Sequence, residues 1–199
     1  MNRPIILASG SEIRLRLLRA AGLDVTATAP RVDEQMVRQS LQAEAAKPHD
    51  IADALAEMKA ARVADKHPEA LVLGCDQVLD FHGTILSKPT NLEQARDQII
   101  ALRDQSHKLL SAAVLYDAGK PIWRHTAEAT LTMRAVSDAY LDAYLARNWP
   151  DLATSVGGYK LESEGVRLFS AISGDYFTIL GLPLLPLLGY LSLRGFIET

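Results

Sequence analysis

The chain has 199 residues, 48% of them hydrophobic, which is enough for one large domain or two small lobes with a buried core. The formal net charge of -3 excludes bulk electrostatic attraction to nucleic acid, so a polyanionic ligand would need local cations. The single cysteine, Cys75, excludes an internal disulfide and favours a reducing, cytoplasmic location. We expect no membrane partner, because no stretch approaches the roughly 20 apolar residues of a membrane span and the N-terminal apolar run is too short for a signal peptide.

Strand and helix patterns alternate in the first half of the chain. The expected elements are a strand at 4–8, a helix begun by Ser11 and stopped by Gly22, a strand at 24–30, a helix at 50–67, a strand at 70–79, a turn at 81–84 and a helix at 91–103. Asp50 is the expected cap of the second helix, and Thr90 with Glu93 forms the expected capping box of the third. Residues 35–50 are polar and favour no single element.

Hairpin signals dominate the second half. A hairpin is expected over 108–136, a helix over 137–149, a strand, turn and glycine-rich loop over 156–183, and a closing helix over 185–195. This order predicts a mixed α/β sheet, not a purely parallel one. The closing helix is apolar on all sides, so we expect a core helix, with a dimer face as the alternative.

Arg14 lies on the apolar side of the first helix. At about 100° per residue, it shares an arc with Leu17 and Leu18. It also follows the small-residue loop 9–11 at a helix N-terminus, where free N–H groups favour anions. Two interpretations stay open: a phosphate cradle, or an arginine that buries its stem and keeps its charged group in solvent.

Asp76 is an acid inside the otherwise apolar strand at 70–79. A buried carboxylate is costly unless it is paired, hydrogen-bonded or bound to a metal. Asp76 is therefore either a structural ion-pair partner or a functional group, a metal ligand or general base. Lys59, at the edge of the inner arc of its helix, has the same two interpretations as Arg14. Cys75 is expected to be a small core residue.

Glu34 and Lys88 complete a set of two acids and three cations at the ends of predicted elements. Glu34 is expected in a polar loop, and Lys88 is held extended because Pro89 follows it. Magnesium is usually bound by one or two carboxylates and completed by substrate phosphates. The set therefore suits a nucleoside triphosphate and no all-protein metal cage.

Seven short motifs occur along the chain in a familiar order. They are LASGSEIR (7–14), VDE (32–34), AEMKA (56–60), LGCDQV (73–78), SKP (87–89), GGYKLE (157–162) and GDYFTILGLPL (174–184). In this order the chain resembles the Maf family of nucleoside triphosphate pyrophosphatases, which are intracellular house-cleaning enzymes also described as septum-formation inhibitors. The resemblance covers nearly the whole chain. It implies a single Maf-like domain over residues 1–199, an elongated mixed α/β sheet with two lobes and a central cleft similar to that of inosine triphosphate pyrophosphatases, and a family tendency to form homodimers.

The resemblance also implies roles for individual residues. Asp76 is implied as the proton acceptor, and with Glu34 it is implied to hold a divalent cation, magnesium or alternatively manganese. The residues implied to bind the triphosphate are Ser9, Arg14, Lys59 and Lys88. We therefore expect a hydrolase acting on acid anhydrides, which releases a monophosphate and pyrophosphate. The alternative is a nucleotide-binding regulator of cell division without turnover, which would have little use for Asp76 as a base.

Base choice is implied at three positions, Ile13, Gln77 and Glu162. The subgroup acting on thymidine and uridine triphosphates has Arg, Thr and Gln there, whereas the Asp-Gln pair and the later Glu look more like the subgroup acting on 7-methyl-GTP. Ile13 departs from both, since it replaces an arginine of the usual S-x-S-P-R-R motif and the tryptophan of the second subgroup. Glu162 can accept hydrogen bonds from the ring N–H and amine of guanine, so we expect a guanine-type base, natural or modified.

Overall fold

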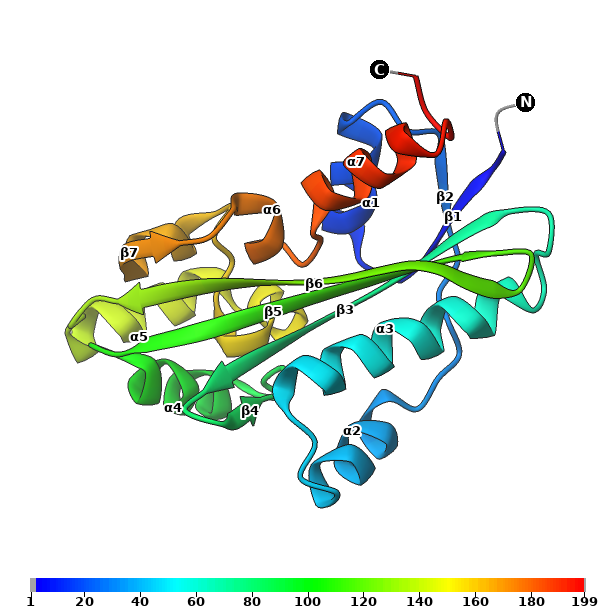
Figure 1. The fold of residues 1–199 in the computed structure, drawn as a ribbon. Coiled ribbons are helices and arrows are strands. Elements are labelled where there is room, and N and C mark those ends of the chain that lie inside the picture. Colours follow the sequence, from blue (N-terminus) through cyan, green and yellow to red (C-terminus); the bar gives the residue numbers. More distant parts are fainter. Residues whose placement is uncertain (1–2, 199) are drawn as a thin grey trace. The chain divides into compact units, whose positions relative to one another are not determined.

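A computed structural model describes residues 3–198 and contains one sheet covered by helices (Figure 1). The strands are β1 (Ile5–Ala8), β2 (Val25–Ala27), β3 (Leu71–Phe81), β4 (Thr84–Leu86), β5 (Ser106–Asp117), β6 (Lys120–Met133) and β7 (Phe169–Ser173). The α-helices are α1 (Glu12–Ala20), α2 (Glu34–Ala43), α3 (Pro48–Ala64), α4 (Leu92–Leu102), α5 (Asp138–Asn148), α6 (Tyr176–Ile179) and α7 (Leu184–Leu193). Short 3-10 helices are η1 (Asp151–Thr154), η2 (Val156–Gly158) and η3 (Glu164–Leu168).

The sheet is mixed, as the order of the elements predicts. Its strands follow the order β2-β1-β3-β5-β6-β7, and β4 pairs with β3. β1 runs parallel to β2 and β3, whereas β4 is antiparallel to β3 and β7 is antiparallel to β6. The fold class predicted from the sequence is therefore confirmed.

The chain divides into two compact units. The first comprises residues up to Gln77, Leu110–Ala127 and the chain from Tyr176 onward, and the second comprises Val78–Leu109 and Glu128–Asp175. The cleft between two lobes that the family resemblance implies stays a prediction. Within the described chain, no helix is both long and apolar enough to cross a membrane.

Helices cover both faces of the sheet in the first unit: α1 and α7 lie on one face, and α3 with α2 lies on the other (Figure 1). Side chains of β3 alternate between these faces, so Leu73 and Cys75 join the core formed with α1 and α7. Gly74 points the other way, and a Cβ atom there would lie 2.1 Å from the carbonyl oxygen of Ala56 in α3. Because Gly74 has no side chain, α3 packs directly on β3, and the inner face of α3 lies close to the backbone of this strand.

The ends of three helices test the capping predictions. Ser11 caps α1 as predicted, since its side chain accepts a hydrogen bond from the backbone N–H three residues on. The predicted cap Asp50 is wrong, because α3 already begins at Pro48, and proline suits a first helical position where no N–H partner is needed. In α4 the predicted cap Thr90 is also wrong, because Asn91 binds the free N–H group instead.

The closing helix α7 buries one face only. Leu184, Leu187 and Leu191 are buried, whereas Leu185 is 58% exposed and Leu193 is 83% exposed. The expected core helix is therefore confirmed for one face, which joins the core of the first unit, whereas Leu185 and Leu193 on the outer side are exposed. A dimer face on this helix stays a prediction.

The second unit has its own small aromatic core. His107 Nε2 and the hydroxyl of Tyr159 lie 2.6 Å apart and buried, and Phe169 packs against both rings. Burial lowers the pKa of His107 to about 4, so this ring is neutral near pH 7. The strand expected at the start of 156–183 is absent there, because Gly157 and Gly158 have positive φ angles and turn the chain.

Candidate active site

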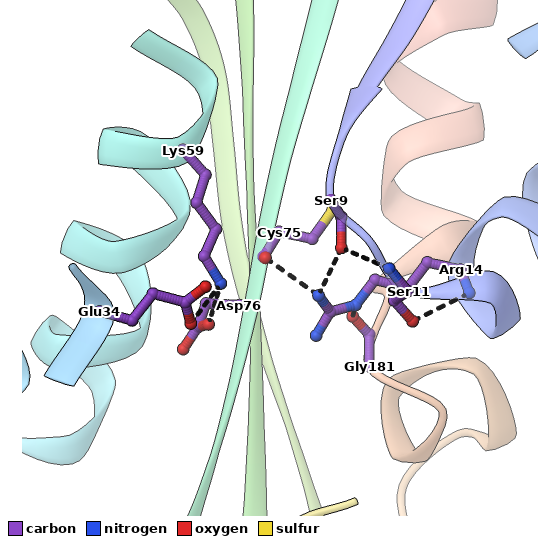
Figure 2. A network of polar contacts seen from close by, with 8 residues as sticks. All are labelled: Ser9, Ser11, Arg14, Glu34, Lys59, Cys75, Asp76 and Gly181. Atoms are coloured by element: carbon purple, nitrogen blue, oxygen red, sulfur yellow. Dashed lines mark hydrogen bonds and ion pairs between the residues drawn. The ribbon is translucent and has the colours of Figure 1, made fainter. Parts of the chain in front are cut away.

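A lysine between two carboxylates forms the charged centre of the first unit (Figure 2). Lys59 Nζ lies 2.6 Å from Asp76 Oδ1 and 2.9 Å from Glu34 Oε2. Lys59 is 5% exposed and Asp76 is 4% exposed, whereas the Glu34 side chain is 42% exposed. The structure therefore excludes snorkelling for Lys59, because its ammonium group is buried together with its stem.

Three elements bring these groups together. Asp76 comes from the side of β3 that faces α3, and Lys59 comes from the inner face of α3. Glu34 is not in a loop, as the polar sequence suggested, but is the first residue of α2. Asp33 caps this helix by accepting a hydrogen bond from the N–H of Met36 at 3.0 Å, and this cap places Glu34 at the start of the helix.

Arg14 forms a second polar centre on the opposite face of β3 (Figure 2). Its Nε donates to the carbonyl of Gly181 at 2.7 Å, and its Nη1 donates to the carbonyl of Cys75 at 3.0 Å and to Ser9 Oγ at 3.3 Å. Ser9 Oγ also accepts from the N–H of Ser11 at 3.1 Å. Arg14 therefore points inward as predicted, and protein acceptors fix its half-buried guanidinium.

The contact between Arg14 and Cys75 continues the sheet where β1 stops. The N–H of Leu71 donates to the carbonyl of Pro4, so every second residue of β3 turns its backbone groups toward β1. Pairing of β1 with β3 ends at Ala8 and Gly74. Cys75 is the next residue to face this side, and its carbonyl meets the guanidinium of Arg14 in place of a strand.

The two centres are therefore joined by consecutive residues of one strand. Cys75 uses its carbonyl to bind Arg14, and Asp76 uses its side chain to bind Lys59. Both lie where β1 ends beside β3, and ligands in open α/β sheets bind at the carboxyl ends of such parallel strands. Ser9 and Arg14 thus lie on one side of β3, and Glu34, Lys59 and Asp76 lie on the other, at the same level of the strand (Figure 2).

One oxygen of the charged centre is uncommitted. Asp76 Oδ2 is buried and has no hydrogen-bond partner in the described chain, which leaves one oxygen for a ligand or a proton. No group of three or more His, Cys, Asp or Glu side chains within residues 3–198 could hold a metal alone. Magnesium sites in proteins usually have one or two carboxylate ligands, and substrate phosphates supply other oxygen ligands.

Cys75 takes no part in the charged chemistry of the site. Burial raises the pKa of its thiol to about 11, and the nearby charges of Arg14 and Lys59 lower it by less. The thiol stays protonated at neutral pH, so it is a poor nucleophile and a poor metal ligand. This agrees with the prediction that Cys75 is a small core residue.

The remaining predicted residues are Ile13, Gln77, Lys88 and Glu162. Ile13 is half-buried in the first turn of α1, and Gln77 uses its amide nitrogen to bind the carbonyls of Thr178 and Ile179. Lys88 is exposed and Glu162 is half-buried, and both belong to the second unit. Their roles in triphosphate and base binding stay predictions.

Sequence reasoning missed two residues that contact this network. Gly181 supplies a carbonyl to Arg14, and Ser111 binds Gln77 Nε2 at 3.0 Å. Ser111 is a lone polar residue in an apolar run, which is the signal that singled out Asp76. Gly181 lies in the motif 174–184, but nothing in that motif indicates an arginine partner far away in the sequence.

Comparison with known proteins identifies the family of the chain. The family model described as Maf-like protein matches residues 4–193. The chain belongs to the Maf family. It is 58% identical over 199 residues to a protein of Ruegeria pomeroyi named nucleoside triphosphate pyrophosphatase, and the match covers 100% of both chains.

A second relative of this Maf-family chain carries a more specific name. A Mesorhizobium japonicum protein named 7-methyl-GTP pyrophosphatase is 46% identical over 198 residues, with 100% of both chains covered. Among solved structures, a HAM1 protein from Coxiella burnetii matches with a TM-score of 0.42 and 13% identity, covering 67% of this chain and 74% of its own. No functional conclusion follows from a structural similarity this weak.

Proposed function

We propose that this Maf-family chain is a nucleoside triphosphate pyrophosphatase that releases a nucleoside monophosphate and pyrophosphate, and that it clears the cytoplasmic nucleotide pool of unwanted triphosphates. One observation carries the proposal: a buried lysine is held between two carboxylates, Asp76 and Glu34, and the residue before Asp76 binds the arginine that follows a polar loop at a helix N-terminus. The names of the relatives from Ruegeria pomeroyi and Mesorhizobium japonicum support the same reaction class.

Asp76 is the group that handles the attacking water. Its Oδ1 is held by Lys59 at 2.6 Å, while Oδ2 is buried and without a protein partner in the described chain. A general base must lie within hydrogen-bond reach of the proton that it accepts, and a fixed carboxylate with one uncommitted oxygen meets this need. Lys59 sets the orientation of the carboxylate, and Oδ2 orients the water or takes its proton.

Glu34 and Asp76 would hold a divalent cation, which we propose to be magnesium, with manganese as the alternative. Such an ion, when bound, neutralises phosphate charge and polarises the phosphoryl oxygens. The contribution of the protein is a buried carboxylate of fixed direction and a half-exposed carboxylate at the start of a helix. The Glu34 side chain reaches solvent, so a ligand that arrives from solvent meets it before Asp76.

Arg14 and Ser9 bind phosphate oxygens. Three protein acceptors hold Nε and Nη1 of Arg14, and no acceptor is found for its Nη2 within residues 3–198. The guanidinium is therefore oriented in advance with N–H groups left for a ligand. Lys88, extended before the buried Pro89, is proposed to contact the triphosphate as well.

The base is proposed to be guanine-type, natural or modified. Glu162 carries this proposal, because a carboxylate can accept from the two adjacent donors of guanine, whereas thymine and uracil have one ring N–H there. Ile13 adds an apolar surface near the phosphate loop but no aromatic stacking. Preference of the enzyme for dTTP or UTP over GTP and 7-methyl-GTP would remove this part of the proposal.

The test is product analysis with magnesium across natural, deaminated and methylated nucleoside triphosphates. The chain should release pyrophosphate and monophosphate, and Asp76→Asn should lose about 10²–10³-fold in rate. Asp65→Asn is the matched control, since Asp65 is an exposed acid at the end of α3, and its rate should stay within about twofold of wild type. Nucleotide binding without turnover would contradict the enzyme proposal and favour the regulator, and full activity of Asp76→Asn would remove Asp76 from the mechanism.

A further inference from the structure

Two side chains on neighbouring strands hold one turn of the chain. Gln77 of β3 donates its amide nitrogen to the carbonyls of Thr178 at 3.1 Å and Ile179 at 3.0 Å. Ser111 of β5 donates its hydroxyl to the carbonyl of Thr178 at 2.7 Å and lies 3.0 Å from Gln77 Nε2. Ser111 and Thr178 are both 0% exposed, so water cannot replace these bonds. We call residues 178–181 the 178–181 turn.

The position of the 178–181 turn depends on these bonds. The turn follows α6, a helix of only four residues, which has too little length to be stable alone. The last carbonyls of a helix have no partner within it, and a buried carbonyl without a donor is costly. Gln77 supplies a donor to the Ile179 carbonyl, and both Gln77 and Ser111 add donors to the Thr178 carbonyl, which also accepts from the N–H of Gly181 at 3.0 Å. The two side chains therefore tie the end of α6 to β3 and β5.

The same turn ends in the residue that orients Arg14. Gly181 has a φ angle of +93°, which is open to glycine, and its carbonyl accepts from Arg14 Nε at 2.7 Å. A Cβ atom on Gly181 would lie 3.0 Å from both Nε and Nη2 of Arg14. The guanidinium therefore lies directly against this stretch of backbone, and a shift of the turn moves the arginine.

We propose that Gln77 and Ser111 are positioning residues, which hold the 178–181 turn so that the Gly181 carbonyl aims Arg14 at the phosphates. This inference rests on the proposed function for the phosphate-binding role of Arg14. It also assigns Gln77 to the phosphate end, because its amide nitrogen is bound to backbone and is not presented to a base. Substitution of Gln77 then weakens all triphosphates equally and leaves base preference unchanged.

The test uses inorganic triphosphate, which has no base, as the probe in binding calorimetry with magnesium. Ser111→Ala and Gln77→Met should each weaken its binding, and lower kcat/KM for every nucleoside triphosphate, by about 10- to 100-fold. In an Arg14→Ala background neither change should weaken binding further, because both act through the arginine. Ser111→Ala and Gln77→Met test the same role independently, so the test survives if one variant does not fold. Thermal unfolding shows whether each variant is folded.

Tyr190→Phe is the matched control. It removes one side-chain hydrogen bond to backbone in the same unit, from the Tyr190 hydroxyl to the carbonyl of Ile122 at 3.1 Å. It should lower the melting temperature by a similar amount while triphosphate binding stays within about twofold of wild type. Equal losses from Ser111→Ala with and without Arg14 would overturn the positioning role, as would a change in base preference with intact binding of inorganic triphosphate. Binding that behaves as expected without turnover of any nucleotide would contradict only the pyrophosphatase proposal.

Discussion

Replacement of Lys59 by methionine measures how much the buried ion pair with Asp76 contributes to the free energy of unfolding. The substitution removes the ammonium 2.6 Å from Asp76 and leaves a carboxylate that is 4% exposed without its partner. Breaking a buried ion pair by removal of one member costs about 3–5 kcal/mol in the free energy of unfolding, because the remaining charge is uncompensated. For a chain of this size about 1 kcal/mol corresponds to 2–4 °C, so the melting temperature should fall by about 6–20 °C.

Urea and thermal unfolding measure this change, and the same chain supplies a matched control. Lys66 is an exposed lysine just beyond the end of α3, so Lys66→Met should alter the free energy of unfolding by about 0.5 kcal/mol or less. The double variant Lys59→Met/Asp76→Leu should recover most of the loss, because it removes both charges and leaves apolar groups. A loss below about 1 kcal/mol for Lys59→Met, or no recovery in the double variant, would refute the buried pair.

Three further predictions concern pH, packing and metal. Burial lowers the pKa of His107 from 6.5 to about 4, so the unfolded chain binds this proton at a higher pH than the folded chain does. The contribution of His107 to the free energy of unfolding should be complete above about pH 6.5 and fall by up to about 3 kcal/mol toward pH 4. Urea unfolding should therefore show a steeper pH dependence for the wild type than for His107→Phe, and equal slopes would contradict this. Gly74→Ala should destabilise by about 3 kcal/mol or more because its Cβ would strike the Ala56 carbonyl, whereas Gly189→Ala, which meets nothing within 4 Å, should not destabilise. Chelation of divalent cations should stop triphosphate hydrolysis and added magnesium should restore it; turnover that persists in chelator would remove the metal role.

The alternation of patterns was sufficient to predict the sheet and most of the helices. Period-3.6 spacing placed Arg14 on an inner face and Lys59 at the edge of one, and both are inward in the structure. α2 was not predicted because its sequence is mostly polar and none of its residues is fully buried, although Val37 and Leu41 are four residues apart and share one side of the helix. The predicted start of α3 was wrong because Asp50 is a typical N-cap residue, whereas the helix already begins at Pro48.

The site was predictable as a set of residue types but not as an arrangement. That Asp76 pairs with Lys59 depends on the close contact of α3 with Gly74, which brings a helix residue and a strand residue far apart in sequence together. That Arg14 binds the Cys75 carbonyl depends on where β1 stops, and local sequence does not indicate strand register. The roles of Ser111 and Gly181 could not be predicted, because they depend on the position of the turn that follows α6, which the local sequence does not indicate.

The arginine that continues the edge of β3 also has a consequence for how Arg14 variants are interpreted. Cys75 is 0% exposed, so its carbonyl relies on Arg14 as a donor, and a buried carbonyl without a donor is costly. A lysine lacks the fork of N–H groups that reaches Cys75, Ser9 and Gly181 together, so even Arg14→Lys leaves some of these acceptors without a donor. A lower rate in an Arg14 variant therefore includes a loss of folding stability, and the two effects separate only when the free energy of unfolding is measured beside the rate.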